Sequence, residues 1–94
     1  MRVRLTSQAA HELGQIADYL DTENPYASIR VEQALKRALS LLAKHPFAGR
    51  LQERGVRRLS VTSYPYLIFY RIDEAPEVVS VLSIRHAARR PEVW

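Results

Sequence analysis

Two kinds of hydrophobic pattern divide the chain. Between residues 7 and 44, apolar residues recur every three or four positions, which is the spacing of amphipathic helices. Before residue 6 and after residue 56, apolar residues instead alternate with polar ones or form short continuous runs, which indicates strands. The pattern predicts one strand, two helices and three further strands, in the order β-α-α-β-β-β.

The helical part is interrupted at residues 21–25, where Asn24 is a good N-cap and Pro25 suits the first position of a second helix. Thr6 or Ser7 can cap the first helix. The two apolar stripes are Ala9, Leu13, Ile16, Ala17 and Leu20, then Ala27, Val31, Ala34, Leu35, Ala38, Leu41 and Leu42. Two such helices joined by so short a break predict an antiparallel helical hairpin, whose apolar seam is available to cover a sheet.

Residues 64–72 are the predicted central strand, because only Arg71 interrupts an almost continuous apolar run after Pro65. Alternation places Tyr66, Ile68, Tyr70 and Ile72 on one face and Leu67, Phe69 and Arg71 on the other. Most of these aromatic residues are therefore expected in the core.

Residues 56–62 and 77–84 are predicted to flank this strand through short turns, and the loop between the second helix and residue 56 is expected to run to about Gly55. Residues 2–5 must join the same sheet to bury Val3 and Leu5. The predicted fold class is α+β: a helical hairpin packed on a small, mainly antiparallel sheet, in one domain that spans residues 1–94.

Composition is consistent with one compact domain, since 47% of the 94 residues are hydrophobic. The chain has no cysteine, so disulfides and thiolate metal sites are excluded. No stretch approaches the roughly 20 apolar residues of a membrane span, and the first residues lack the apolar run of a signal peptide. The expectation is a soluble, cytoplasmic protein with no membrane partner.

Basic residues are unevenly distributed. Fourteen lysines and arginines oppose ten acidic residues, and twelve of the fourteen are arginines, eight of them between Arg50 and Arg90. Guanidinium groups make bidentate contacts with carboxylates and phosphates, so the partner is expected to be nucleic acid, an acidic protein or both. The alternative is that these arginines only protect strand edges against aggregation.

Catalytic motifs are sparse. Histidines and carboxylates lack metal-ligand spacing and the three glycines are too scattered for a phosphate loop, so no metal and no cofactor are expected. Metal-free RNA cleavage would need an acid, a base and cations, for which His86, Glu53, Arg50, Arg57, Arg58, Arg85 and Arg89 are the candidates. The alternative for His86 is a structural histidine that bonds to backbone at a strand end.

The basic C-terminal segment combines Arg85, Arg89 and Arg90 with Trp94, which is the composition of an interface hot spot. The alternative is a frayed tail.

Several segments together resemble the RelE/ParE superfamily of toxins from bacterial type II toxin–antitoxin systems, with the ParE branch the closer likeness. They are the β-α-α-β-β-β order with Asn24-Pro25 opening the second helix, and the segments at residues 45–50, 55–61, 64–70 and 84–91. The resemblance implies a small toxin that a cognate antitoxin neutralises by wrapping it with a C-terminal segment, in a toxin–antitoxin hetero-oligomer.

Within this superfamily, ParE-like toxins inhibit DNA gyrase, whereas RelE-like toxins cut messenger RNA in the ribosomal A site. Ribosome-dependent members of the superfamily tend to carry several lysines and arginines around the site, often with a tyrosine or histidine near the C-terminus. This chain has no lysine beyond Lys44 and no tyrosine after His86, so the resemblance to the nuclease branch is weaker. We therefore expect a gyrase-binding toxin that is not an enzyme. Its expected target-binding residues are Arg50, Arg57, Arg58, Arg85, His86, Arg89, Arg90 and Trp94.

Two alternatives stay open. One is a RelE-like, metal-independent endoribonuclease that uses Arg57, His86 and Arg50. The other is a degenerate family member that binds its antitoxin without being toxic.

Overall fold

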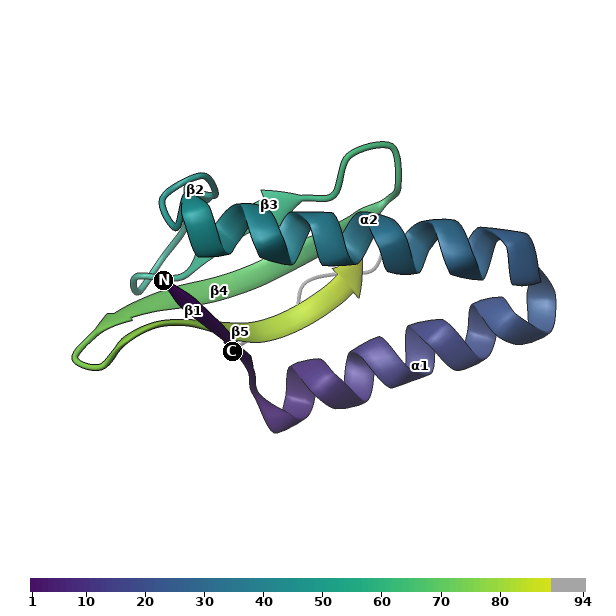
Figure 1. Ribbon diagram of the computed structural model, residues 1–94, viewed down its shortest axis with the longest axis horizontal. Coiled ribbons are helices and arrows are strands. Elements are labelled where there is room, and N and C mark those ends of the chain that lie inside the picture. The colour runs from purple at the N-terminus through teal and green to yellow at the C-terminus, as the bar shows by residue number, and fades with distance from the viewer. Residues whose placement is uncertain (89–94) are drawn as a thin grey trace.

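The computed structural model describes residues 1–88 and confirms the predicted fold class. The elements follow in the order β1 (Arg2–Leu5), α1 (Ser7–Glu23), α2 (Pro25–Lys44), β2 (Arg50–Leu51), β3 (Arg57–Ser60), β4 (Tyr66–Glu74) and β5 (Glu77–His86). The strands form one sheet in the order β1-β5-β4-β3-β2, with only β1 parallel to its neighbour. Figure 1 shows α2 running antiparallel to α1 and crossing in front of β4.

Both helices begin at the predicted caps. The Thr6 hydroxyl accepts a hydrogen bond from Ala9 N at 3.2 Å, and the Asn24 side chain accepts one from Ala27 N at 3.1 Å. Pro25 occupies the first turn of α2, where its missing N–H costs nothing. The Ser28 hydroxyl donates to the Asp21 carboxylate, which joins the end of α1 to the start of α2.

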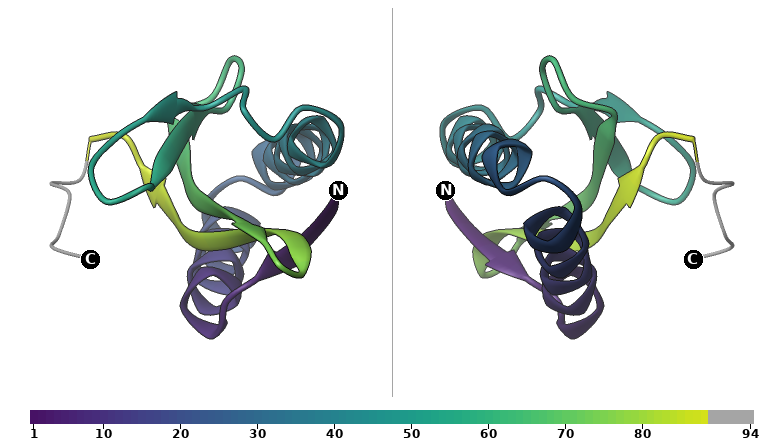
Figure 2. Two further views of the ribbon diagram at one scale, coloured as in Figure 1. Left: turned by 90° about the vertical axis from the view of Figure 1, so that its left-hand side faces the viewer. Right: turned by 90° about the vertical axis from the view of Figure 1, so that its right-hand side faces the viewer.

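A single core lies between the helices and one face of the sheet. From β4 it takes Tyr66, Ile68 and Tyr70, so the predicted alternation is confirmed. The partners of these residues in the sheet and the helices are also buried, namely Val79, Val81, Ile84, Ala9, Val31, Ala34, Leu35, Ala38 and Leu42. Figure 2 shows that neither helix lies on the side of β3 and β4 turned away from α2.

Two features of the sheet differ from the predicted pattern. Leu82 is left without a partner, because Phe69 pairs with Ser83 and Tyr70 pairs with Val81. This bulge adds one residue to β5 and bends the strand where β1 ends. The second difference is β2, a two-residue edge strand inside the segment predicted as a loop.

The β2–β3 hairpin forms because Arg54 and Gly55 both take positive φ angles, 58° and 75°. Val56 N donates to Glu53 O at 3.1 Å across this turn, which has the primed geometry that suits strand twist. Arg54 is unusual at such a position, because glycine and asparagine are preferred there.

Gly14 lies in the interior of α1, and a Cβ added there would meet no atom within 4 Å. Gly14→Ala is therefore expected to raise the free energy of unfolding by about 0.5–1 kcal/mol, since alanine loses less backbone entropy in a helix. Denaturant or thermal unfolding measures this. The control is Gly49→Ala, whose Cβ would lie 2.6 Å from the Tyr70 hydroxyl and which should destabilise the protein. A destabilised Gly14→Ala protein would contradict the placement of Gly14 inside α1 with free space around it.

Candidate functional site

Strand pairing decides on which face each candidate residue lies. Arg50 pairs with Arg58, and Arg58 pairs with Phe69, so both arginines lie on the face turned away from the core. Arg57 pairs with Tyr70 and therefore lies on the same face as the core residues. The three arginines of the paired strands β2 and β3 thus divide between the two faces of the sheet.

Arg57 and Tyr70 hold the loop that follows α2. The Tyr70 hydroxyl donates to Pro46 O at 2.7 Å and accepts from Gly49 N at 2.8 Å. The Arg57 guanidinium donates to Gly49 O at 2.9 Å and lies 4.9 Å from the centre of the Phe47 ring. Burial raises the pKa of the Tyr70 phenol, so this hydroxyl stays protonated and can donate. Tyr70 is completely buried, as expected for most aromatic residues of this strand.

His86 lies at the end of β5. Its Nδ1 accepts a hydrogen bond from Ala88 N at 3.1 Å, and its ring packs edge-on against Tyr66 with the centroids 5.5 Å apart. A bond to the backbone at a strand end is the arrangement of a structural histidine, and here the backbone engages the Nδ1 lone pair.

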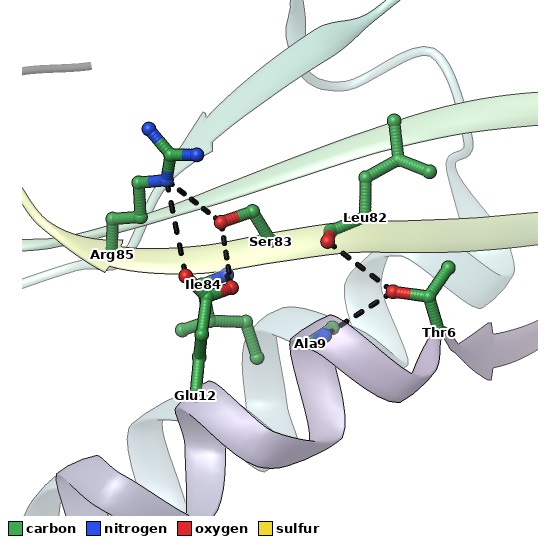
Figure 3. Close-up of polar contacts among 7 residues, drawn as sticks. All are labelled: Thr6, Ala9, Glu12, Leu82, Ser83, Ile84 and Arg85. Carbon is green, nitrogen blue, oxygen red and sulfur yellow. Dashed lines mark hydrogen bonds and ion pairs between the residues drawn. The ribbon is translucent and has the colours of Figure 1, made fainter. Parts of the chain in front are cut away.

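Arg85 belongs to a network that secures the open edge of β5 beyond β1 (Figure 3). Glu12 of α1 accepts from the Ser83 hydroxyl at 2.7 Å and from Ile84 N at 3.2 Å. Arg85 Nε donates to the Ser83 hydroxyl at 2.8 Å and lies 4.0 Å from the other Glu12 oxygen. The Arg85 side chain is only 10% exposed, so its guanidinium is part of the fold.

The same edge is supported where the bulge lies. The Thr6 hydroxyl donates to Leu82 O at 3.2 Å (Figure 3). Thr6 N donates to Val81 O at 3.0 Å. Thr6 therefore caps α1 and also continues the pairing of β1 onto the bulged residue. The sequence indicated the cap but carried no signal for the bond to the bulge.

A second polar network lies on the face away from the core. Arg71 Nε donates to Asp73 at 3.1 Å, the Ser80 hydroxyl donates to the other Asp73 oxygen at 2.7 Å, and Arg4 donates to Ser80 at 3.2 Å. The Ser80 and Arg71 bonds lower the pKa of the Asp73 carboxyl below its ordinary 3.8. A lowered pKa means that this network stabilises the fold above pH 3.8 and that the stabilisation is lost as the pH falls through the lowered value.

The residues proposed for RNA cleavage do not converge. Arg57 is opposite Tyr70 and His86 is opposite Tyr66, and their strands flank β4 on its two sides. Four residues along β4 and two strand spacings separate their backbones by about 16 Å. Arg50 lies on the other face of the sheet. Glu53, the candidate base, occupies the exposed turn of the β2–β3 hairpin.

Three of the predicted binding residues, Arg89, Arg90 and Trp94, lie outside the described residues. Within residues 1–88, no group of three or more histidine or acidic side chains is placed to hold a metal ion. In the same range, no helix is long and apolar enough to cross a membrane.

The fold and these contacts define a small α+β domain with a helical hairpin over one face of a five-stranded sheet and arginines on the other. Residues 3–91 match the family model described as ParE toxin of type II toxin-antitoxin system, parDE, so the chain belongs to this family of toxins.

Individual relatives agree with the family. Toxin RelE2 of Caulobacter vibrioides is 39% identical over 84 residues, which cover 89% of this chain and 92% of the relative. A solved structure described as the chromosomal ParDE TA system from P. aeruginosa superimposes with a TM-score of 0.75 at 26% identity, covering 92% of this chain and 95% of that one. The toxin–antitoxin complex RelBE2 from Mycobacterium tuberculosis has a TM-score of 0.62 at 24% identity, covering 90% of this chain and 95% of that one, and shows the shared fold.

Proposed function

We propose that this toxin acts by binding DNA gyrase and that a cognate antitoxin neutralises it. The observation that carries the proposal is the separation of Arg57, His86 and Arg50. An acid and a charge-stabilising group must both come within about 3 Å of the reacting atoms. Arg57 and His86 are about 16 Å apart at the backbone, Arg57 is bonded to Gly49 O, and Arg50 is on the other face of the sheet, so this arrangement does not favour the three residues gathering around one phosphate.

Hydrogen bonds that Arg57 and His86 make within the fold also support this proposal. Arg57 is bonded to the loop after α2, and the His86 Nδ1 lone pair is used by the backbone. A toxin that binds its target needs no catalytic group, only a surface that favours one conformation of that target. Arg50 and Arg58 are the predicted target-binding residues whose side chains make no bond to another residue in the described range, so they are available to contact gyrase or the DNA that gyrase holds.

The proposed antitoxin site is the groove between α1 and α2. Its volume is about 470 Å³, and its lining is mostly apolar. Ala10, Gly14 and Ala17 form one side of it, and their small size lets another helix approach closely. The chain carries a net charge of +4, so an amphipathic antitoxin helix with acidic flanking residues matches it. The resulting assembly would be a toxin–antitoxin hetero-oligomer.

A second candidate function is ribosome-dependent cleavage of messenger RNA. It is favoured by the 39% identity to a relative named toxin RelE2. This candidate would need other catalytic residues than Arg57, His86 and Arg50, or a rearrangement that brings these three together.

Purified toxin added to gyrase and relaxed plasmid tests the proposal. Supercoiling should stop at a toxin concentration comparable to that of gyrase, and an equimolar amount of the cognate antitoxin should restore it. Expression without the antitoxin should arrest growth. Normal growth, with supercoiling unaffected, would instead assign the chain to the degenerate members that only bind antitoxin.

A further inference from the structure

The face of the sheet turned away from the core carries a group of arginines that spans all five strands. Their positions follow from the register, which pairs Arg50 with Arg58, Arg71 with Ser80, Arg4 with Ser80 and Arg2 with Val78. We call this group the arginine face, and its six members within residues 1–88 are Arg2, Arg4, Arg50, Arg58, Arg71 and Arg85. Four strand spacings separate its outermost members, which is about 19 Å.

In the part of the chain that the structure describes, few carboxylates oppose these charges. Asp73 binds Arg71 directly and Arg4 through Ser80, and Glu12 faces Arg85. Among residues 1–88, Arg50 and Arg58 have no carboxylate within 4.0 Å, and the neighbours of Arg58 across the strands are Arg50 and Phe69. Like charges placed side by side cost free energy unless an anion lies between them. The Arg50–Arg58 pair is therefore the point where an anionic ligand gains most.

The composition of the arginine face favours nucleic acid over protein. Protein interfaces are anchored by aromatic and apolar residues, whereas interfaces with nucleic acid are more polar and positively charged. The large exposed apolar side chains of the described range are Met1, Tyr19, Tyr26, Ile29, Leu41, Phe47 and Leu51, and none lies on the arginine face. A protein partner would find charge there but little apolar surface to bury.

The same face favours a duplex over a single strand. Proteins that bind single strands stack the bases on exposed aromatic rings. Among residues 1–88, the aromatic residue of the arginine face is Phe69, which is only 6% exposed and has the Arg85 guanidinium 5.8 Å from its ring centre. Guanidinium groups without a stacking ring suit the phosphates of a duplex, and a span of about 19 Å covers five or six base pairs.

We propose that the arginine face binds the phosphate backbone of duplex DNA, without reading sequence, and that Arg50 and Arg58, on β2 and β3 at one end of this face, make its principal phosphate contacts. This inference goes beyond the proposed function, because it is a property of the toxin alone and does not require gyrase. In a complex with gyrase it would let the toxin contact the DNA that the enzyme holds.

Fluorescence anisotropy with a labelled 20-base-pair DNA duplex tests this. Binding should weaken steeply as KCl is raised from 50 to 200 mM. At 100 mM KCl, the double variant R50A/R58A should bind at least about tenfold more weakly than the wild type. Its plot of log K against log salt should be shallower by about 2, the loss of two phosphate contacts. The control is R30A/R37A, which removes the same charge from exposed positions of α2 and should bind like the wild type. Thermal unfolding of both variants checks that they are folded.

Several outcomes would overturn the proposal. Equal weakening by R30A/R37A would mean that net charge alone attracts DNA. Tighter binding of single-stranded DNA or of duplex RNA of the same length would assign the arginine face to a different nucleic acid. Binding of a polyglutamate peptide, lost in R50A/R58A and without binding to duplex DNA, would assign it to an acidic protein. Gyrase is absent from every arm, so the result is independent of the supercoiling test.

Discussion

Replacing Tyr70 with phenylalanine is expected to lower the free energy of unfolding by about 2–4 kcal/mol. The substitution removes the hydroxyl that bonds Pro46 O and Gly49 N, at 2.7 and 2.8 Å, and leaves the rest of the ring in place. Gly49 is buried, so its N–H would lose its partner without gaining water, and such a group costs about 1–3 kcal/mol. For a domain of this size, the melting temperature should fall by about 10–20 °C.

The matched control for this prediction is Tyr64→Phe. Tyr64 is half-buried, and its hydroxyl makes no hydrogen bond to another residue of the described range. Its loss should change the free energy of unfolding by less than about 0.5 kcal/mol. If both variants are equally stable, the loop after α2 is not held by Tyr70, and the structural role given to Arg57 in the same loop is also wrong.

Glu12→Ala is expected to lower the free energy of unfolding by about 2–4 kcal/mol. Glu12 is the partner of the Ser83 hydroxyl and of Ile84 N on the edge of β5 that β1 leaves open (Figure 3). Ser83 is fully buried and Ile84 is 1% exposed. With alanine at position 12, the Ser83 hydroxyl and Ile84 N would each lose this acceptor in an apolar environment. Arg85, 4.0 Å from the carboxylate, would lose its opposite charge as well. Denaturant unfolding measures the difference.

Glu32→Ala is the control for Glu12→Ala. Both substitutions put alanine into a helix, so the change in helix propensity cancels. Glu32 pairs with Lys36 at 3.2 Å, but its side chain is 64% exposed, and such a pair contributes about 0.3–0.5 kcal/mol. Equal, small losses in both variants would show that Glu12 does not secure the edge of β5.

The parts of the fold that the sequence predicted depend on local signals. Asn24 followed by Pro25 marks the start of α2 because capping and the missing N–H act within one turn. The alternation in β4 predicts its buried face because neighbouring side chains must point in opposite directions. These signals need no knowledge of distant residues.

The parts that the sequence did not predict depend on distant contacts. Glu12 lies off the apolar stripe of α1 and looks like a solvated residue until the bulge at Leu82 brings the free edge of β5 against it. Arg57 and His86 have the residue types of a nuclease site, and their strands were predicted to flank β4, but the sequence does not reveal the register that places them four residues apart along β4. The missed hairpin at β2 had a signal, Gly55 at a turn position, which Arg54 obscured.

The central claim is that this toxin binds gyrase and does not cut RNA with Arg57 and His86. The most direct measurement tests one preparation of toxin in two assays. The first measures supercoiling by gyrase, and the second detects cleavage of messenger RNA in a translating extract by primer extension. We predict that supercoiling is inhibited, that the messenger RNA stays intact, and that His86→Ala inhibits supercoiling like the wild type. Messenger RNA cut in the translating extract, with the cleavage lost in His86→Ala, and supercoiling unaffected would contradict the claim.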